Sequence, residues 1–114
     1  MPMRYVVIDV YPRDYLDRVI QDLNSWFRIF AGKDAIGIGL KVVAKYEGRG
    51  RLVIQVPNNL LSHLRSAIVM VGRGDGVAVV TVKVTGTMRK ALAIASSVPY
   101  LFNEFIGQGQ VSSS

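Results

Sequence analysis

The sequence predicts a single α+β domain with a four-stranded sheet, two covering helices and a further C-terminal helix. Four segments are rich in β-branched residues, and two longer segments between them repeat apolar residues at helical spacing. The chain has 114 residues, which is near the commonest domain size and enough to bury a core. We expect the domain to occupy residues 1–106, and residues 107–114, composed mostly of Gly, Gln and Ser, to form a disordered tail.

The first half of the chain predicts a strand, a helix and a hairpin. Residues 4–11 (RYVVIDVY) are a β-branched run that ends at Pro12, which indicates a strand. From Asp14 to Phe30 the apolar residues recur at i, i+3, i+4 and i+7, so an amphipathic helix is expected to run up to Gly32. Residues 36–46 and 51–56 are two further predicted strands, which the turn at residues 47–50 joins into a hairpin.

The second half repeats the order of helix and strand. A helix is expected from Asn58, its candidate N-cap, to Gly72, followed by a glycine-rich turn and a strand over residues 77–85. Thr87 is expected to cap another helix through Ala95, and residues 99–105 to form a last short helical piece. The buried side of the first of these helices consists of Leu60, Leu61, Leu64, Ile68 and Val71. The order β-α-β-β-α-β predicts a ferredoxin-like two-layer sandwich with an additional C-terminal helix.

The parity of the strand residues indicates which sheet face is buried. Even-numbered positions in all four predicted strands are almost purely apolar, so we expect them to face the two long helices. The odd-numbered positions mix basic and apolar residues. Gly37 and Gly39 fall on this second face and favour the close approach of another element. The C-terminal helix is the candidate for that cover.

Charge and composition restrict the classes of function. Fourteen Lys and Arg against eight Asp and Glu leave a net charge of +6 and a pI near 10.0, which is typical of a nucleic-acid binder. The chain has no cysteine, which excludes disulfides and thiolate chemistry. Its start lacks a secretion signal, and no run of 18 apolar residues predicts a membrane span. We therefore expect a cytoplasmic protein without membrane association.

Catalytic chemistry is not predicted. His63 is the only histidine, and a lone helical histidine is more often a structural residue than a catalyst. No serine or threonine lies in a nucleophile motif, and no phosphate-binding glycine loop is present. Asp14 and Asp17 fall on a solvated helix face and Asp9 on a strand, so no carboxylate cluster for a metal is expected. The sequence predicts neither a catalytic residue nor a bound cofactor or metal.

Two basic segments are the candidate RNA contacts. The hairpin carries Lys45, Arg49 and Arg51 beside a Gly-rich turn, although a plain solvated turn explains them equally well. In the other segment a strand leads into a helix start, where Arg89 and Lys90 oppose the helix dipole. A bound phosphate would favour these cations there, although simple N-capping by Thr87 is the alternative explanation. The predicted third strand, residues 50–56, has no aromatic residue on which a base could stack, so contacts to phosphates are expected instead. The full candidate set is Lys41, Lys45, Arg49, Arg51, Lys83, Thr85, Thr87, Arg89 and Lys90.

Several of these segments together resemble ribonuclease P protein component 2, the archaeal relative of a eukaryal ribonuclease P/MRP subunit family. They are RYVVIDV, GKDAIGIGLKVVAKY, RLVIQVP, LLSHLRSAI and, most specifically, VKVTGTMRKA. The family's strand-to-helix signature is usually Ser-Gly-Thr-Ile followed by a basic residue, and here it is Thr85-Gly86-Thr87-Met88-Arg89. The resemblance covers roughly residues 4–95 and does not extend to the C-terminal segment.

This resemblance implies a noncatalytic subunit of ribonuclease P, the endoribonuclease that removes the 5′ leader from precursor tRNA. In the family, the RNA subunit holds Mg²⁺ and performs the hydrolysis. The protein binds the ribonuclease P RNA, pairs with ribonuclease P protein component 3 and can self-associate, and it meets precursor tRNA through the holoenzyme. The alternatives from the residues alone are a ferredoxin-like ligand-sensing domain and a generic RNA-binding domain. An acylphosphatase-type enzyme is disfavoured because the first strand-to-helix turn has no Arg-bearing phosphate loop.

Overall fold

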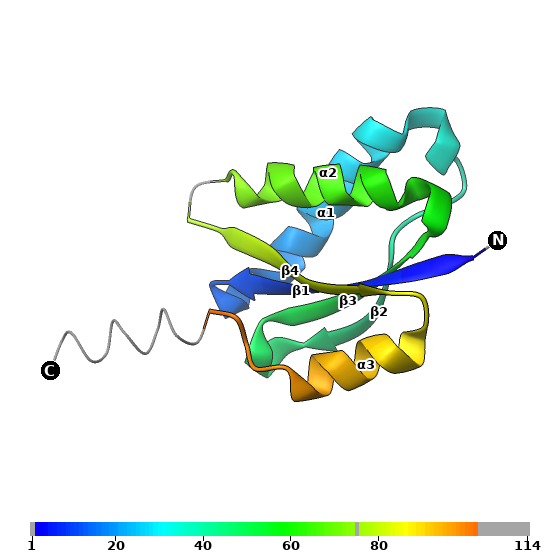
Figure 1. The fold of residues 1–114 in the computed structure, drawn as a ribbon. Coiled ribbons are helices and arrows are strands. Elements are labelled where there is room, and N and C mark those ends of the chain that lie inside the picture. Colours follow the sequence, from blue (N-terminus) through cyan, green and yellow to red (C-terminus); the bar gives the residue numbers. More distant parts are fainter. Residues whose placement is uncertain (1, 75, 103–114) are drawn as a thin grey trace, which may run out of the picture.

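The computed structural model describes residues 2–74 and 76–102 and shows an α+β fold (Figure 1). Its sheet has four antiparallel strands in the order β2-β3-β1-β4. The described part of the chain contains three α-helices and several single turns of 3-10 helix. The elements are β1 (Met3–Tyr11), α1 (Leu16–Ala31), β2 (Lys41–Tyr46), β3 (Arg51–Pro57), α2 (Leu61–Gly72), β4 (Ala78–Thr85) and α3 (Met88–Ser97).

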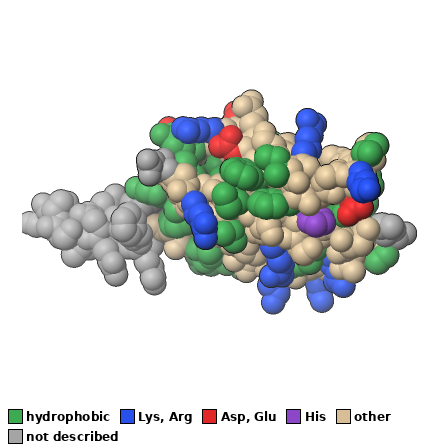
Figure 2. All heavy atoms as spheres, turned by 90° about the horizontal axis from the view of Figure 1, so that it is seen from above, with side chains coloured by type: hydrophobic (Ala, Val, Ile, Leu, Met, Phe, Trp, Pro, Cys, Tyr) green, Lys and Arg blue, Asp and Glu red, His purple; other side chains and the backbone are tan. Residues whose placement is uncertain are grey.

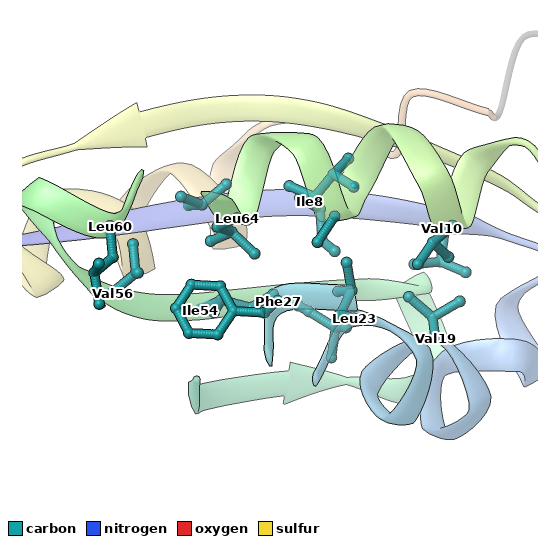
Figure 3. Packing of buried hydrophobic residues seen from close by; sticks show 14 of the residues in the cluster. Ile8, Val10, Val19, Leu23, Phe27, Ile54, Val56, Leu60 and Leu64 are labelled. Atoms are coloured by element: carbon teal, nitrogen blue, oxygen red, sulfur yellow. The ribbon is translucent and has the colours of Figure 1, made fainter. Parts of the chain in front are cut away.

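The helices lie on both sides of the sheet. Figure 1 shows α1 and α2 side by side above the strands and α3 below them. The larger core therefore lies between the sheet and α1 with α2, as the alternation of strand residues predicts. Val6, Ile8 and Val10 of β1 are fully buried there. Figure 3 shows Leu23 and Phe27 of α1 and Leu64 of α2 in the same cluster as Ile8 and Val10.

The period of α1 explains why this core forms. Leu16, Val19, Leu23 and Phe27 are all buried, with exposed fractions of 1–3%, because residues three and four apart share one face of a helix. Each such side chain contributes roughly 1.5–3 kcal/mol when it leaves water. The buried residues of α2 follow the same rule, with Leu64, Ile68 and Val71 facing inward. The predicted apolar faces of both long helices are confirmed in most positions, but Phe30 at the end of α1 is 37% exposed and Leu61 at the start of α2 is half-buried.

A second, smaller core lies under α3. Val7 and Val53 on the other face of the central strands are fully buried against Ala91 and Ala95 of α3. Alanine side chains are short, so the α3 backbone can approach the sheet closely. The prediction that the C-terminal helix covers part of this face is confirmed. The two central strands, β1 and β3, are thus buried on both sides.

The strand expected over residues 36–46 begins only at Lys41. Gly37 has φ +74°, a left-handed conformation that an extended strand does not contain. Residues 33–38 form turns, in which the Ile36 and Ile38 N–H groups donate to the carbonyls of Lys33 and Ala35. No other atom approaches the Cβ positions of Gly37 and Gly39 within 4 Å. The expected close approach at these two glycines is therefore wrong.

The parity prediction holds for β1 and β3 but fails in both edge strands. In β2 the register shifts between Val42 and Ala44, and Ala44 packs in the smaller core under α3. In β4 the partners of Val7 and Ile8 are Lys83 and Thr81, so Val82 is the extra residue. A β-bulge of this kind reverses the facing of every residue beyond it. Beyond the bulge, Val79 of β4 packs in the larger core.

The predicted helix boundaries have mixed outcomes. Thr87 caps α3 as expected, since its side chain accepts from the Lys90 N–H group. Asn58 does not cap α2, because Asn58–Leu60 is a 3-10 turn and the Asn58 side chain accepts from Arg4 instead. Residues 99–102 are not helical, and residues 103–114, including the expected tail, lie outside the described residues. None of the helices in the described ranges has the length and apolarity needed to cross a membrane.

Candidate nucleic-acid interface

The junction of β4 and α3 is held by two threonine hydroxyls. The Thr85 hydroxyl donates to the backbone carbonyl of Thr87 at 2.8 Å. The Thr87 Oγ1 atom accepts from the Lys90 N–H group at 3.2 Å, and the Thr87 carbonyl accepts the first helical bond, from Ala91. The N–H groups of Met88 and Arg89 precede that first bond, as at any helix start. The junction therefore presents backbone donors on a fixed turn.

Positive side chains surround this junction. Lys83, Arg89 and Lys90 are exposed. Between residues 48 and 102 the sequence has a single acidic residue, Asp75. This part of the sequence therefore supplies few carboxylates to offset the positive charge at the β4–α3 turn.

Arg4 also belongs to the junction, although it was not predicted. β1 and β4 are antiparallel and Tyr5 pairs with Thr85, so the start of β1 lies next to the end of β4. The Arg4 Nη1 atom lies 3.2 Å from the position that a Cβ atom would take on Gly86, and Nε donates to Asn58 Oδ1 at 2.8 Å. A side chain at residue 86 would thus press on the Arg4 guanidinium, and the Gly86 backbone is not left-handed. Only the pairing of distant strands reveals this neighbour.

A hollow of about 410 Å³ opens beside the junction, between the end of β4 and α3. We call it the β4–α3 hollow. Lys83 of β4 and Lys90 of α3 contribute positive charge to its wall, and Ala93 and Ile94 of α3 contribute apolar surface. The lining residues are Lys83, Val84, Thr85, Gly86, Lys90, Ala93 and Ile94.

The expectation that Arg51 is available to RNA on the hairpin is wrong, because Arg51 is buried. Its side chain is 0% exposed and forms a salt bridge with the equally buried Asp9. Nε donates to Asp9 Oδ1 at 2.5 Å and Nη2 to Oδ2 at 2.9 Å. The three remaining N–H groups donate to the carbonyls of Ala95, Val98 and Pro99 at 2.6–3.0 Å. Arg51 has no donor left for a phosphate.

Arg49 is exposed but is bound to the end of α3. Its Nη1 atom donates to the carbonyls of Ala95 and Ser96 at 3.0 and 2.8 Å. The last carbonyls of a helix carry partial negative charge, so a guanidinium is favourable there. A second hollow of about 260 Å³ lies at this place, lined in part by Arg13, Arg49 and Tyr100. The hairpin arginines therefore attach α3 to the sheet.

The two hairpin lysines differ in their surroundings. Lys45 Nζ lies 2.8 Å from Asp17 and 3.0 Å from Glu47, and the hydrogen bonds to these carboxylates raise the pKa of Lys45. Lys41 is exposed and pairs with Gln55 on the α3 side of the sheet. The bulge at residue 43 separates the two lysines onto opposite faces. The predicted basic hairpin is thus not one continuous surface.

The structure divides the predicted RNA-binding residues into two groups. Lys83, Thr85, Thr87, Arg89 and Lys90 come together at the β4–α3 junction. Lys41, Lys45, Arg49 and Arg51 do not join them in one site. Within residues 2–74 and 76–102, no three side chains of the His, Asp or Glu type gather as a metal site would require.

Several large apolar side chains of the helical layer are exposed. Figure 2 views that layer from above, with apolar side chains grouped in its middle and basic ones around the edge. Trp26 and Phe30 stack with their ring centroids 5.8 Å apart. The large apolar residues exposed on α1, α2 and the turns after α1 are Ile29, Phe30, Ile36, Ile38 and Val69, and we call them the helical apolar surface. Ile29 is 65% and Ile36 77% exposed.

Fold and site together define an α+β domain with a basic strand-to-helix junction and an exposed apolar helical flank. Comparison with protein-family models and with curated proteins finds no match for this chain.

Proposed function

We propose that this chain is a noncatalytic subunit of ribonuclease P that binds RNA phosphates at the β4–α3 junction. The observation that carries the proposal is the junction itself. Lys83, Arg89 and Lys90 surround a turn that two threonine hydroxyls hold in place, and Arg4 reaches the same turn from β1. Cations and helix N–H groups at one place are what a phosphate needs.

The arrangement of the sheet supports the same proposal. The strand order β2-β3-β1-β4, with every neighbouring pair antiparallel, agrees with a ferredoxin-like βαββαβ sandwich. The sequence that resembles ribonuclease P protein component 2 most specifically, VKVTGTMRKA, forms the end of β4 and the start of α3. The residues that carry the resemblance are thus the residues of the proposed interface.

The proposed mechanism is neutralisation and positioning. The junction's cations reduce the repulsion between RNA phosphates, so the catalytic RNA folds at lower Mg²⁺ concentration. Mg²⁺ ions and the hydrolysis of precursor tRNA belong to the RNA subunit. In this chain, Lys83, Arg89 and Lys90 bind the RNA phosphates and take no part in activating water.

Ribonuclease P protein component 3 is the proposed protein partner. Because α3 already covers much of the second sheet face, the helical apolar surface is the better candidate for that contact. Its exposed residues Ile29 and Val69 lie on α1 and α2, which together form one layer. Covering this surface removes apolar area from water and contributes to association.

Reconstitution with ribonuclease P RNA and component 3 tests the proposal. The Lys83→Ala/Lys90→Ala double variant should weaken RNA binding and flatten the slope of log affinity against log salt by about 1.4 to 1.8, because two phosphate contacts are lost. Its matched control is Arg18→Ala/Arg73→Ala, which removes the same charge at the opposite end of the sheet. Equal effects of the two double variants, or cleavage of precursor tRNA by the protein without RNA, would contradict the proposal.

A further inference from the structure

The β4–α3 hollow has a composition that phosphate binding alone does not explain. Lys83 and Lys90 supply positive charge to its wall, but Ala93 and Ile94 supply apolar surface beside them. A surface that only follows an RNA backbone needs cations and has no use for an apolar recess. The volume of about 410 Å³ falls in the range of sites for small molecules, roughly 300–1,000 Å³.

We propose that the β4–α3 hollow receives one unpaired nucleotide of RNA. The phosphate lies at Lys83 and Lys90, and the base lies against Ala93 and Ile94. The inference rests on the proposed function, because it concerns the same interface, and it adds that the bound RNA segment is single-stranded there. A nucleotide is anionic at one end and apolar on its base face, which is the combination that the wall presents.

A continuous RNA duplex would not fill the β4–α3 hollow. Its bases are stacked inside the helix and its phosphates are outermost, so it would touch the lysines and leave the recess empty. An unpaired nucleotide can turn its base into the recess while its phosphate stays at the edge. The same recess predicts weak sequence preference, because methyl and methylene groups contact every base alike and the Thr85 hydroxyl already donates to Thr87.

Ala93 offers a way to fill the recess without changing charge. Its side chain is exposed on α3 and lines the hollow, so Ala93→Leu adds bulk where the base would lie and keeps both lysines. Ser66→Leu is the matched control, since it places a leucine on an exposed position of α2, on the other side of the sheet. Both leucines are good helix formers.

The experiment measures binding of a short oligoribonucleotide that carries 2-aminopurine, once as a single strand and once as a duplex. Fluorescence anisotropy gives affinity across salt concentrations, and 2-aminopurine emission rises when the base leaves its stack. Ala93→Leu should bind the single strand roughly tenfold more weakly, with an unchanged salt slope and without the rise in emission. Its affinity for the duplex and the behaviour of Ser66→Leu should match those of the unmodified protein.

The outcomes separate this inference from the proposed function. If Ala93→Leu changes neither affinity nor emission while Lys83→Ala/Lys90→Ala still weakens binding, the nucleotide in the hollow is refuted and the RNA interface stands. Equal weakening of single strand and duplex by Ala93→Leu also refutes it, because the leucine would then disturb the lysines. If the unmodified protein binds neither RNA, the proposed function fails, and the inference fails with it.

Discussion

Arg51 uses all five of its N–H groups to hold the chain after α3 against the sheet. Two of them bind Asp9, and the other three bind carbonyls of Ala95, Val98 and Pro99. Asp9 in turn accepts from the Leu101 N–H group at 2.8 Å. A buried guanidinium is tolerated only when its donors are satisfied in this way. One side chain thus links β1, β3 and the end of α3.

Removing this side chain should destabilise the fold strongly. Arg51→Ala leaves the Asp9 carboxylate buried without its partner, and breaking a buried pair in this way costs about 3–5 kcal/mol. Urea denaturation measures the free energy of unfolding, with the exposed Arg49→Ala as the control that should lose far less. Asp9→Leu/Arg51→Met, which removes both charges, should recover part of the loss. A similar small loss for both arginine variants would contradict the structural role of Arg51.

At the scale of the element, the end of β4 and the start of α3 act together. The turn of residues 85–87 joins the outer strand β4 to a helix on the second face of the sheet, and Figure 1 shows this change of layer beside the start of β1. Thr87 satisfies one of the N–H groups that a helix start leaves open. The same turn has to leave space for the Arg4 guanidinium over Gly86. Structural and proposed binding roles therefore meet in three consecutive residues.

Thr87→Ala should separate these roles. Loss of the cap costs about 1 kcal/mol of stability, measured by thermal or urea unfolding, whereas Thr87→Ser keeps the hydroxyl and should cost little. Because a frayed first turn presents its N–H groups less well, RNA affinity should also fall for Thr87→Ala and recover in Thr87→Ser. Unchanged affinity in the alanine variant would mean that no phosphate lies at the start of α3.

Gly86→Ala tests the space at the same turn. The added Cβ atom would lie 3.2 Å from Arg4 Nη1, so the guanidinium has to shift by a few tenths of an ångström. We expect slightly weaker RNA binding with an unchanged salt slope, and little loss of stability because the displaced group is the end of a flexible side chain. Arg4→Ala removes the guanidinium altogether and should weaken RNA binding more, and adding Gly86→Ala to it should cause no further loss. Additive defects would contradict a shared mechanism.

At the scale of the whole molecule, helices cover both faces of the sheet, and the two cores that result differ in composition. The larger core is apolar throughout, with Phe27, Leu23 and Leu64 packed on the central strands. The smaller core is completed by polar contacts at its end, where Arg51 and Tyr100 bind the backbone of neighbouring segments. Tyr100 is 5% exposed, its hydroxyl donates to the Val10 carbonyl, and burial raises the pKa of Tyr100 above its ordinary value of 10.0.

Stability should therefore fall in alkaline solution. Folded Tyr100 holds its proton more tightly than the unfolded chain does, so its contribution is fully present below pH 10.0 and is lost as the pH rises through the raised pKa. The raised pKa of Lys45 acts in the same direction and at a similar pH. Unfolding midpoints at increasing pH measure the loss. Tyr100→Phe should flatten this pH dependence, and an unchanged profile in that variant would assign the loss to other groups.

The local sequence pattern was enough to predict most of the secondary structure, because the two-residue period of a strand and the 3.6-residue period of a helix can both be recognised from residues close together in the chain. The apolar face of α1 and the hydroxyl cap at Thr87 are examples, and so is the grouping of Lys83, Arg89 and Lys90, which lie close together in the chain. The burial of Arg51 was not predictable in this way. It depends on Asp9 and on the carbonyls of residues 95–99, which reach Arg51 only when α3 crosses the sheet.

Tertiary structure also decided the facing of the edge strands and the place of Arg4. An alternating sequence does not reveal where an extra residue is inserted, since a bulge arises from how a strand pairs with its neighbour. Lys41 and Lys45 were therefore predicted on one face and lie on two. Arg4 and Gly86 are far apart in sequence and meet because β1 and β4 are antiparallel. Local periodicity specifies elements, whereas pairing between distant segments determines which side chains share a site.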